Sequence, residues 1–229
     1  MIPACKGCLR QRLVDAYVRR KVRASFRGVW LRGELPASSG GLLVYVNHTN
    51  WWDGFVLHQL SRAAGWDGYA LMEERTLARY RFLRHLGAFS VRRGEASSSL
   101  ETLRYARDLL RLADAAVFVF PEGEHRPPGE LPLRLERGVE TLARMSQVPS
   151  LPVAIRYVFF EHERPDVLFD VGTPHPPLRL GEYQRRLEER VVALQAVTRL
   201  DGFHRLLEGR RGVAERWDAV RGLDRREPR

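Results

Sequence analysis

The chain has 229 residues, enough for one substantial domain but too few for two complete cores, so we expect a single domain with added ends. Apolar residues make up 44% of the sequence and charged residues 29%, a balance that excludes a disordered chain. No stretch approaches the roughly 20 apolar residues that a membrane-spanning helix needs. The first 30 residues also lack the apolar stretch of a secretory signal, so we expect a location on the cytoplasmic side.

The net charge of +10 is unevenly distributed along the chain. Residues 1–34 carry nine Lys or Arg against two acidic residues, residues 209–229 carry seven Arg against four, and the rest sums to zero. A neutral body with a basic arm fits attraction to anionic lipid headgroups better than a duplex-binding face. We therefore expect a membrane surface as partner and no nucleic acid, with a basic nucleic-acid-binding module as the rival interpretation.

Residues 1–30 form a predicted N-terminal arm in which apolar residues recur about every four positions, with arginines between them. This spacing gives an apolar stripe beside a basic face, as in a helix that lies in a membrane interface. A helix packed on the domain with a solvated arginine face fits the pattern equally well. For the membrane interpretation we predict contacts by Arg12, Tyr17, Arg19, Arg20, Arg23, Phe26 and Arg27.

Residues 31–208 form the predicted main domain, in which short apolar runs alternate with amphipathic stretches. This alternation predicts an α/β fold, with a largely parallel or mixed central sheet flanked by helices. We predict strands over residues 42–46, 69–72, 88–91, 115–120, 151–160 and 167–171. We predict helices over residues 53–62, 73–86, 95–112, 135–145 and 182–207, followed by a basic tail over 209–229.

His48 and Asp53 stand five positions apart, in the turn between a predicted strand and a predicted helix. Such a turn allows the carboxylate to meet one imidazole nitrogen while the other faces a cleft, which is the arrangement of a general base. A pair that only stabilises the turn is the alternative. Trp51 and Trp52 in the same turn are expected to be buried, as lining of an acyl pocket or as a cap on the core.

Four blocks between residues 27 and 157 carry a family resemblance. Residues 47–53 contain His-x-x-x-x-Asp, residues 87–93 read Gly-Ala-Phe-Ser-Val-Arg-Arg, residues 120–123 read Phe-Pro-Glu-Gly, and residues 151–155 read Leu-Pro-Val-Ala-Ile. In this order they resemble the motifs of glycerolipid acyltransferases of the 1-acylglycerol-3-phosphate acyltransferase type. Any one block is a weak signal, but the ordered set is a strong one.

The resemblance implies an O-acyltransferase in which His48 takes the proton of an acceptor hydroxyl and Asp53 stabilises the imidazolium. It implies that Arg93 holds the acceptor's phosphate and that Glu122 and Gly123 help to bind the acceptor. The implied donor is an acyl thioester, either acyl-CoA or acyl carrier protein, and no bound cofactor or metal is expected. The implied acceptor is lysophosphatidic acid, used by an enzyme peripheral to the cytoplasmic side of the cell membrane.

The third block departs from the family pattern after its glycine. Where the family usually has Thr-Arg, this chain has Glu124 and His125, with an arginine only at Arg126. An added carboxylate beside a phosphate site repels a dianionic headgroup unless Arg93 or Arg126 offsets it. Either Arg126 therefore substitutes in substrate binding, or the acceptor is a less anionic lipid alcohol such as a glycolipid.

Overall fold

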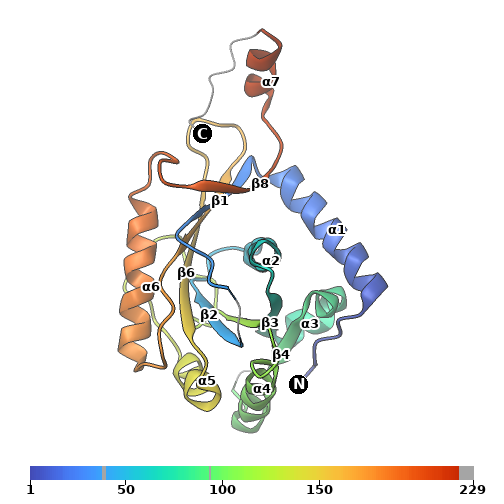
Figure 1. Ribbon diagram of the computed structural model, residues 1–229, viewed down its shortest axis with the longest axis vertical. Helices are drawn as coiled ribbons and strands as arrows, with labels where there is room; N and C mark the ends of the chain where they lie inside the picture. Colours follow the sequence, from blue (N-terminus) through green and yellow to red (C-terminus); the bar gives the residue numbers. More distant parts are fainter. Residues whose placement is uncertain (38–39, 93, 222–229) are drawn as a thin grey trace.

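The computed structural model describes residues 1–37, 40–92 and 94–221 (Figure 1). Eight strands form one sheet in the order β4-β3-β5-β2-β6-β7-β1-β8. Its strands are β1 (Gly28–Arg32), β2 (Leu42–Val46), β3 (Asp67–Glu73), β4 (Ala88–Val91), β5 (Ala115–Val119), β6 (Ser150–Val158), β7 (Asp166–Val171) and β8 (His204–Glu208). The five strands from β4 to β6 in this order are parallel, whereas β7 and β8 pair antiparallel with β6 and β1. The predicted α/β fold with a mixed sheet is confirmed.

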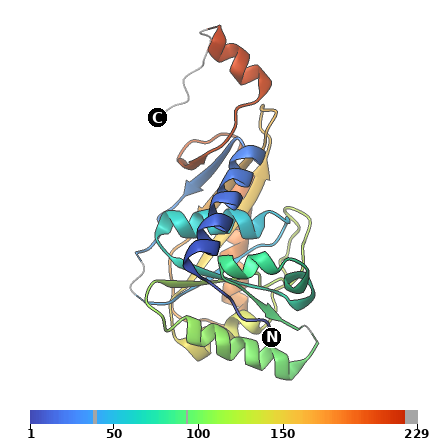
Figure 2. The same ribbon diagram turned by 90° about the vertical axis from the view of Figure 1, so that its right-hand side faces the viewer.

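The helices cover both faces of the sheet (Figure 1). One face packs against α1 and α2, which cross each other in Figure 2, and the other packs against α4, α5 and α6. The helices are α1 (Cys8–Ser25), α2 (Asp53–Ala64), α3 (Glu74–Arg79), the 3-10 helix η1 (Arg81–Leu86), α4 (Ala96–Leu109), α5 (Gly138–Ser146), α6 (Leu180–Gln195) and α7 (Val213–Val220). Within the described ranges, none of these helices is long and apolar enough to span a membrane.

Strand β2 lies at the centre of the sheet and leads into the turn that carries His48. All five of its residues are buried, because helices cover both faces of the sheet at this point. Val44 and Val46 pack into the cluster under α1 and α2, whereas Leu43 and Tyr45 pack into the cluster under α4, α5 and α6. A continuous apolar run therefore fixes the strand, and the polar residues that follow emerge at its carboxyl end.

Two strands of the sheet, β1 and β8, differ from the sequence-based expectation. The apolar spacing of the arm places Val29 and Trp30 on the amphipathic helix, but α1 ends at Ser25 and both residues lie in β1. The predicted helix over 182–207 is also wrong beyond Gln195, where α6 ends, and β8 begins at His204. In both cases the residues form a strand instead of a helix because they pair with segments distant in the sequence. Strand β1 pairs with β7 on one side and with β8 on the other.

Of the two predicted domain boundaries, the first lies inside a strand and the second lies directly after one. Residue 30 lies inside β1, in the sheet of the main domain. The predicted basic tail begins directly after β8 and contains α7. The chain ahead of α1 is also tied to the sheet edge, because Ile2 and Ser90 of β4 bond through two contacts, Ile2 N to Ser90 Oγ at 2.7 Å and Ser90 N to Ile2 O at 3.0 Å.

Candidate active site

The structure brings the predicted pair His48 and Asp53 together at the carboxyl end of β2. His48 Nδ1 lies 2.9 Å from Asp53 Oδ2. The same oxygen accepts the main-chain N–H groups of Thr49 at 2.9 Å and Asn50 at 3.0 Å, and the Asp53 side chain is fully buried. The turn thus folds around the carboxylate, which fixes the orientation of the imidazole. His48 Nε2 has no hydrogen-bond partner in the described part of the chain, and the side chain is 20% exposed.

Tyr157, near the end of β6, completes the surroundings of the carboxylate. Its hydroxyl donates to Asp53 Oδ1 at 2.6 Å. Burial, reinforced by the neighbouring carboxylate, raises the pKa of Tyr157 well above its ordinary value, so the hydroxyl keeps its proton and remains a donor. Asn47 places β6 beside the turn, because its amide exchanges hydrogen bonds of 3.0 and 2.8 Å with the main chain of Ile155. Two positions further along the strand, the side chain of Tyr157 therefore reaches Asp53.

We expect Tyr157→Phe to lower kcat about tenfold with little change in KM, since the change removes one hydrogen bond to the carboxylate that orients His48. Tyr45→Phe is the matched control: its hydroxyl is also buried and lies 2.9 Å from His175 Nε2, away from the pair. Both variants should lose about 1 kcal/mol of folding free energy. Steady-state kinetics and thermal unfolding measure the two effects. Equal kcat values for the two variants would show that Tyr157 only supports the fold.

The loop after β5 holds the main chain of His48 from two sides. Glu122 Oε2 accepts the N–H of His48 at 3.0 Å, and the N–H of Arg126 donates to the His48 carbonyl at 2.8 Å. Gly123 allows the intervening turn, since its φ of 72° is disfavoured for other residues. Burial raises the pKa of Glu122, which is 4% exposed. One oxygen of Glu122 is therefore bonded to the turn that carries His48, rather than free to contact an acceptor.

Two rings lie against the imidazole of His48. Phe120 stacks on it with a centroid distance of 4.0 Å, and the His125 ring lies at 3.9 Å with a tilt of 47°. Burial and the neighbouring His48 lower the pKa of His125, which favours its neutral form near neutral pH. In the sequence, His125 stands out as a departure from the family pattern. Its place in the third block, three residues after Glu122, is the one sequence signal that puts it near His48.

The arginines expected to bind phosphate are differently placed. Arg126 lies 2.9 Å from Glu124 and 3.8 Å from Glu130, so two carboxylates offset its charge. Arg93 lies outside the described residues. Its neighbour Arg92 pairs with Glu74 at 2.8 Å and is half exposed.

Trp51 and Trp52 also differ in their placement. The expectation of burial is wrong for Trp51, which is 53% exposed and packs edge-on against Trp52 and Phe55. It lies on the surface because it sits in the exposed part of the turn, ahead of the buried first residue of α2. Trp52 is partly buried, and its ring contacts that of Phe26 at a centroid distance of 5.1 Å.

Two of the predicted membrane contacts do not face outward. Phe26 is 3% exposed and packs on Trp52 and Tyr157, whereas Arg27 pairs with Asp166 at 3.3 Å. Both are turned inward because α1 ends just before them and the chain enters β1. The predictions for Phe26 and Arg27 are therefore wrong. The other five lie on the outer surface of α1: Arg12, Tyr17, Arg19, Arg20 and Arg23.

Comparison with known proteins defines the class to which this fold and site belong. A family model described as Acyltransferase matches residues 28–156, more than half of the chain. The chain belongs to this acyltransferase family and is an O-acyltransferase, a different class from the rival nucleic-acid-binding module. The fold is similar to that of the 1-acyl-sn-glycerophosphate (LPA) acyltransferase PlsC from Thermotoga maritima, with a TM-score of 0.57, 20% identity, and coverage of 82% of this chain and 81% of that one. No curated protein matches the sequence.

Proposed function

We propose that the protein transfers a fatty acyl group from an acyl thioester to the hydroxyl of a lipid, with His48 as general base. The observation that carries this proposal is the 2.9 Å contact between His48 Nδ1 and Asp53. A carboxylate that accepts a hydrogen bond from Nδ1 keeps that nitrogen protonated, so Nε2 is left as the basic atom. The partial exposure of His48 at the carboxyl end of the sheet, where ligands gather in such folds, supports this role.

In the proposed reaction, His48 Nε2 takes the proton of the acceptor hydroxyl as its oxygen attacks the thioester carbonyl. The tetrahedral intermediate then collapses, the carbon–sulfur bond breaks, and the thiolate leaves with the proton from the imidazolium. Asp53 stabilises the imidazolium between these two steps. The products are a lipid ester and a free thiol, and His48 regains its starting protonation state without forming a covalent acyl-enzyme. Either acyl-CoA or acyl carrier protein supplies the thioester.

The acceptor that the family resemblance favours is a lysophospholipid such as lysophosphatidic acid, the substrate for which the Thermotoga maritima protein is named. One observation favours a second candidate. Because Glu124 and Glu130 offset the charge of Arg126, this side chain offers less attraction to a phosphate than a free arginine does. A less anionic lipid alcohol, such as a glycolipid, is the alternative acceptor. Labelled acyl-CoA supplied with a panel of both kinds of acceptor, followed by identification of the acylated product, separates them.

We expect Glu124→Thr to raise kcat/KM for lysophosphatidic acid about three- to tenfold, with little change for the uncharged acceptor monoacylglycerol. The change removes the carboxylate 2.9 Å from Arg126, and the gain is modest because Glu124 is 58% exposed and screened by solvent. Glu130→Thr is the control, since its carboxylate lies at 3.8 Å and its removal should have a smaller effect. Equal changes in kcat/KM for both acceptors would show that Arg126 does not bind the phosphate of lysophosphatidic acid.

We also propose that the enzyme works as a peripheral protein on an anionic membrane, on the cytoplasmic side, and that α1 contacts this membrane. The inner face of α1 is buried through Val18 and Val22. Its outer face carries an apolar row, Leu9, Leu13 and Tyr17, which are 72%, 64% and 53% exposed. Arginines flank this row on both sides, which supports contact with acidic headgroups. The helix is thus both packed on the domain and apolar on its outer surface.

A further inference from the structure

Helix α7 carries an exposed apolar face that the catalytic site does not use. Val213, Trp217 and Val220 are 58%, 59% and 79% exposed. Their spacing of four and three residues places them on one side of the helix. Figures 1 and 2 show α7 projecting from the end of the molecule beyond β8. Solvent exposure of three apolar side chains on a protruding helix costs free energy, so the face is expected to have an apolar partner.

The base of α7 is bonded to the residue ahead of β1 and to the loop between β6 and β7. Glu215 Oε1 lies 2.9 Å from Arg27 Nε, and the N–H of Val213 donates to Glu163 Oε2 at 2.7 Å. Arg27 follows Phe26, whose ring lies 5.7 Å from the ring of Tyr157, the residue bonded to Asp53. A short series of direct contacts therefore connects α7 to the catalytic carboxylate.

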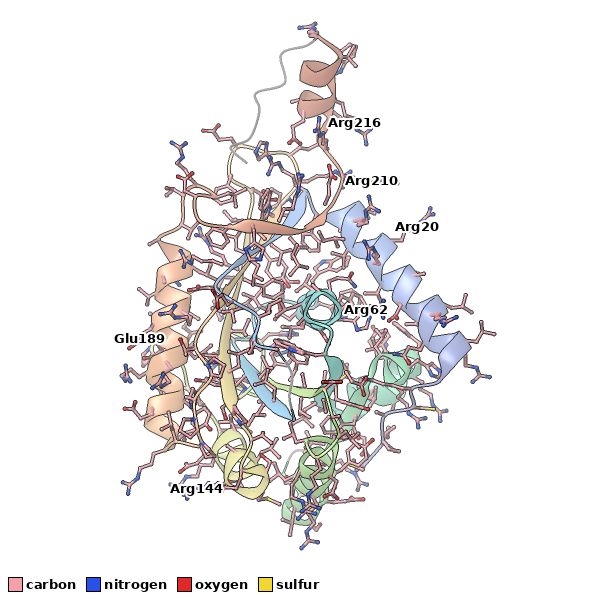
Figure 3. The ribbon with its side chains drawn as sticks, viewed as in Figure 1. Arg20, Arg62, Arg144, Glu189, Arg210 and Arg216 are labelled. Carbon is pink, nitrogen blue, oxygen red and sulfur yellow. The ribbon has the colours of Figure 1, made fainter. Side chains whose placement is uncertain are left out.

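Arginines lie along and beside α7, and the loop bonded to the start of the helix carries an exposed aromatic residue. Four exposed arginines lie in or beside the helix: Arg210, Arg211, Arg216 and Arg221. Figure 3 shows Arg210 and Arg216 on the same side of the molecule as Arg20 of α1. Phe159, in the loop between β6 and β7 that also carries Glu163, is 59% exposed. Trp and Phe beside arginines are typical of segments that lie at the boundary between lipid headgroups and acyl chains.

We propose that α7 is an interfacial anchor that inserts Val213, Trp217 and Val220 into the surface of an anionic lipid bilayer. Its arginines contact the headgroups, and the anchor holds the carboxyl edge of the sheet, with His48, close to the lipid that supplies the acceptor. The role of α7 in holding His48 near the acceptor rests on the proposed function, but binding of α7 to lipid can be measured independently of it. A single helix of eight residues is too small for a stable interface between two copies, which needs about 800 Å² on each partner.

The test measures co-sedimentation of the full chain with vesicles of equal parts phosphatidylcholine and phosphatidylglycerol. We expect the double variant Val213→Ser, Trp217→Ser to bind about tenfold more weakly than the native chain. Val192→Ser is the matched control: Val192 is 48% exposed but lies on α6, and its replacement should change binding less than about twofold. Binding of the native chain should also weaken with added salt and on vesicles of phosphatidylcholine alone. Equal binding by the double variant and the native chain would overturn the anchor.

Activity measurements separate this inference from the proposed function. With a short-chain acceptor dissolved in water, the double variant should retain the native rate, whereas with the acceptor embedded in vesicles its rate should fall with its binding. If vesicle binding falls but neither protein acylates any acceptor, the proposed function fails and the anchor stands. If vesicle binding is unchanged while binding to an acidic acyl carrier protein is lost, the face belongs to that protein and the lipid inference is wrong.

Discussion

Replacement of His48 by Ala is expected to lower kcat by about 10²- to 10⁴-fold, because the acceptor hydroxyl then loses the base that accepts its proton. The fold should survive this change. Asp53 keeps three donors after the imidazole is removed, namely the main-chain N–H groups of Thr49 and Asn50 and the hydroxyl of Tyr157. The buried carboxylate is therefore not left without hydrogen bonds, which would otherwise cost several kcal/mol.

The measurement is single-turnover transfer of a labelled acyl group, with thermal unfolding to establish that the variant is folded. His204→Ala is a suitable control, since His204 is an exposed histidine on the edge strand β8. It should retain the native rate. A folded His48→Ala protein with full transfer activity would remove His48 from the mechanism.

The second large effect is expected from Asp53→Asn, which should lower kcat about 10³-fold. The amide oxygen can take the place of Asp53 Oδ2 and accept from His48, Thr49 and Asn50, while the amide nitrogen faces the hydroxyl of Tyr157. The geometry of the turn is thus retained, but the negative charge that stabilises the imidazolium is lost. We expect a loss of about 1–3 kcal/mol of folding free energy, since hydrogen bonds to a charged acceptor become bonds to a neutral one.

Asp53→Ala provides the contrast, because it removes the acceptor from all these donors at once. It should be less stable than Asp53→Asn and no more active. Urea unfolding and single-turnover kinetics on both variants make the comparison. If the asparagine variant turned over at nearly the native rate, the carboxylate would serve only to hold the turn, which is the alternative interpretation of the pair.

The turn that brings His48 and Asp53 together could be predicted from the sequence because its contacts are local. The sequence between Leu42 and Asp53 contains a buried apolar strand, a turn and the start of a helix. The position of the strand end therefore also predicts the contact between His48 and Asp53. Tyr157 could not be found in this way. It lies 104 residues from Asp53, and its contact depends on the pairing of β6 beside β2.

The same distinction explains the errors at the end of the arm. The repeat of apolar residues continues past Ser25 into Val29 and Trp30, so periodicity alone extends the helix too far. The strand forms because β7 and β8, which are distant in the sequence, supply its hydrogen-bonding partners. Phe26 and Arg27, at the junction of α1 and β1, turn inward for that reason, although their spacing in the sequence fits the predicted membrane-contacting helix.

Transfer of an acyl group from a thioester to a lipid hydroxyl releases one thiol for each ester formed, so counting both products of one reaction tests it. The native protein is incubated with radiolabelled acyl-CoA and vesicles that contain a lysophospholipid or a lipid alcohol, and released thiol and labelled lipid ester are measured together. We predict equal amounts of thiol and ester, with neither above background in the His48→Ala variant. Thiol release accompanied by free fatty acid instead of a lipid ester would contradict this mechanism, because water would then be the acceptor.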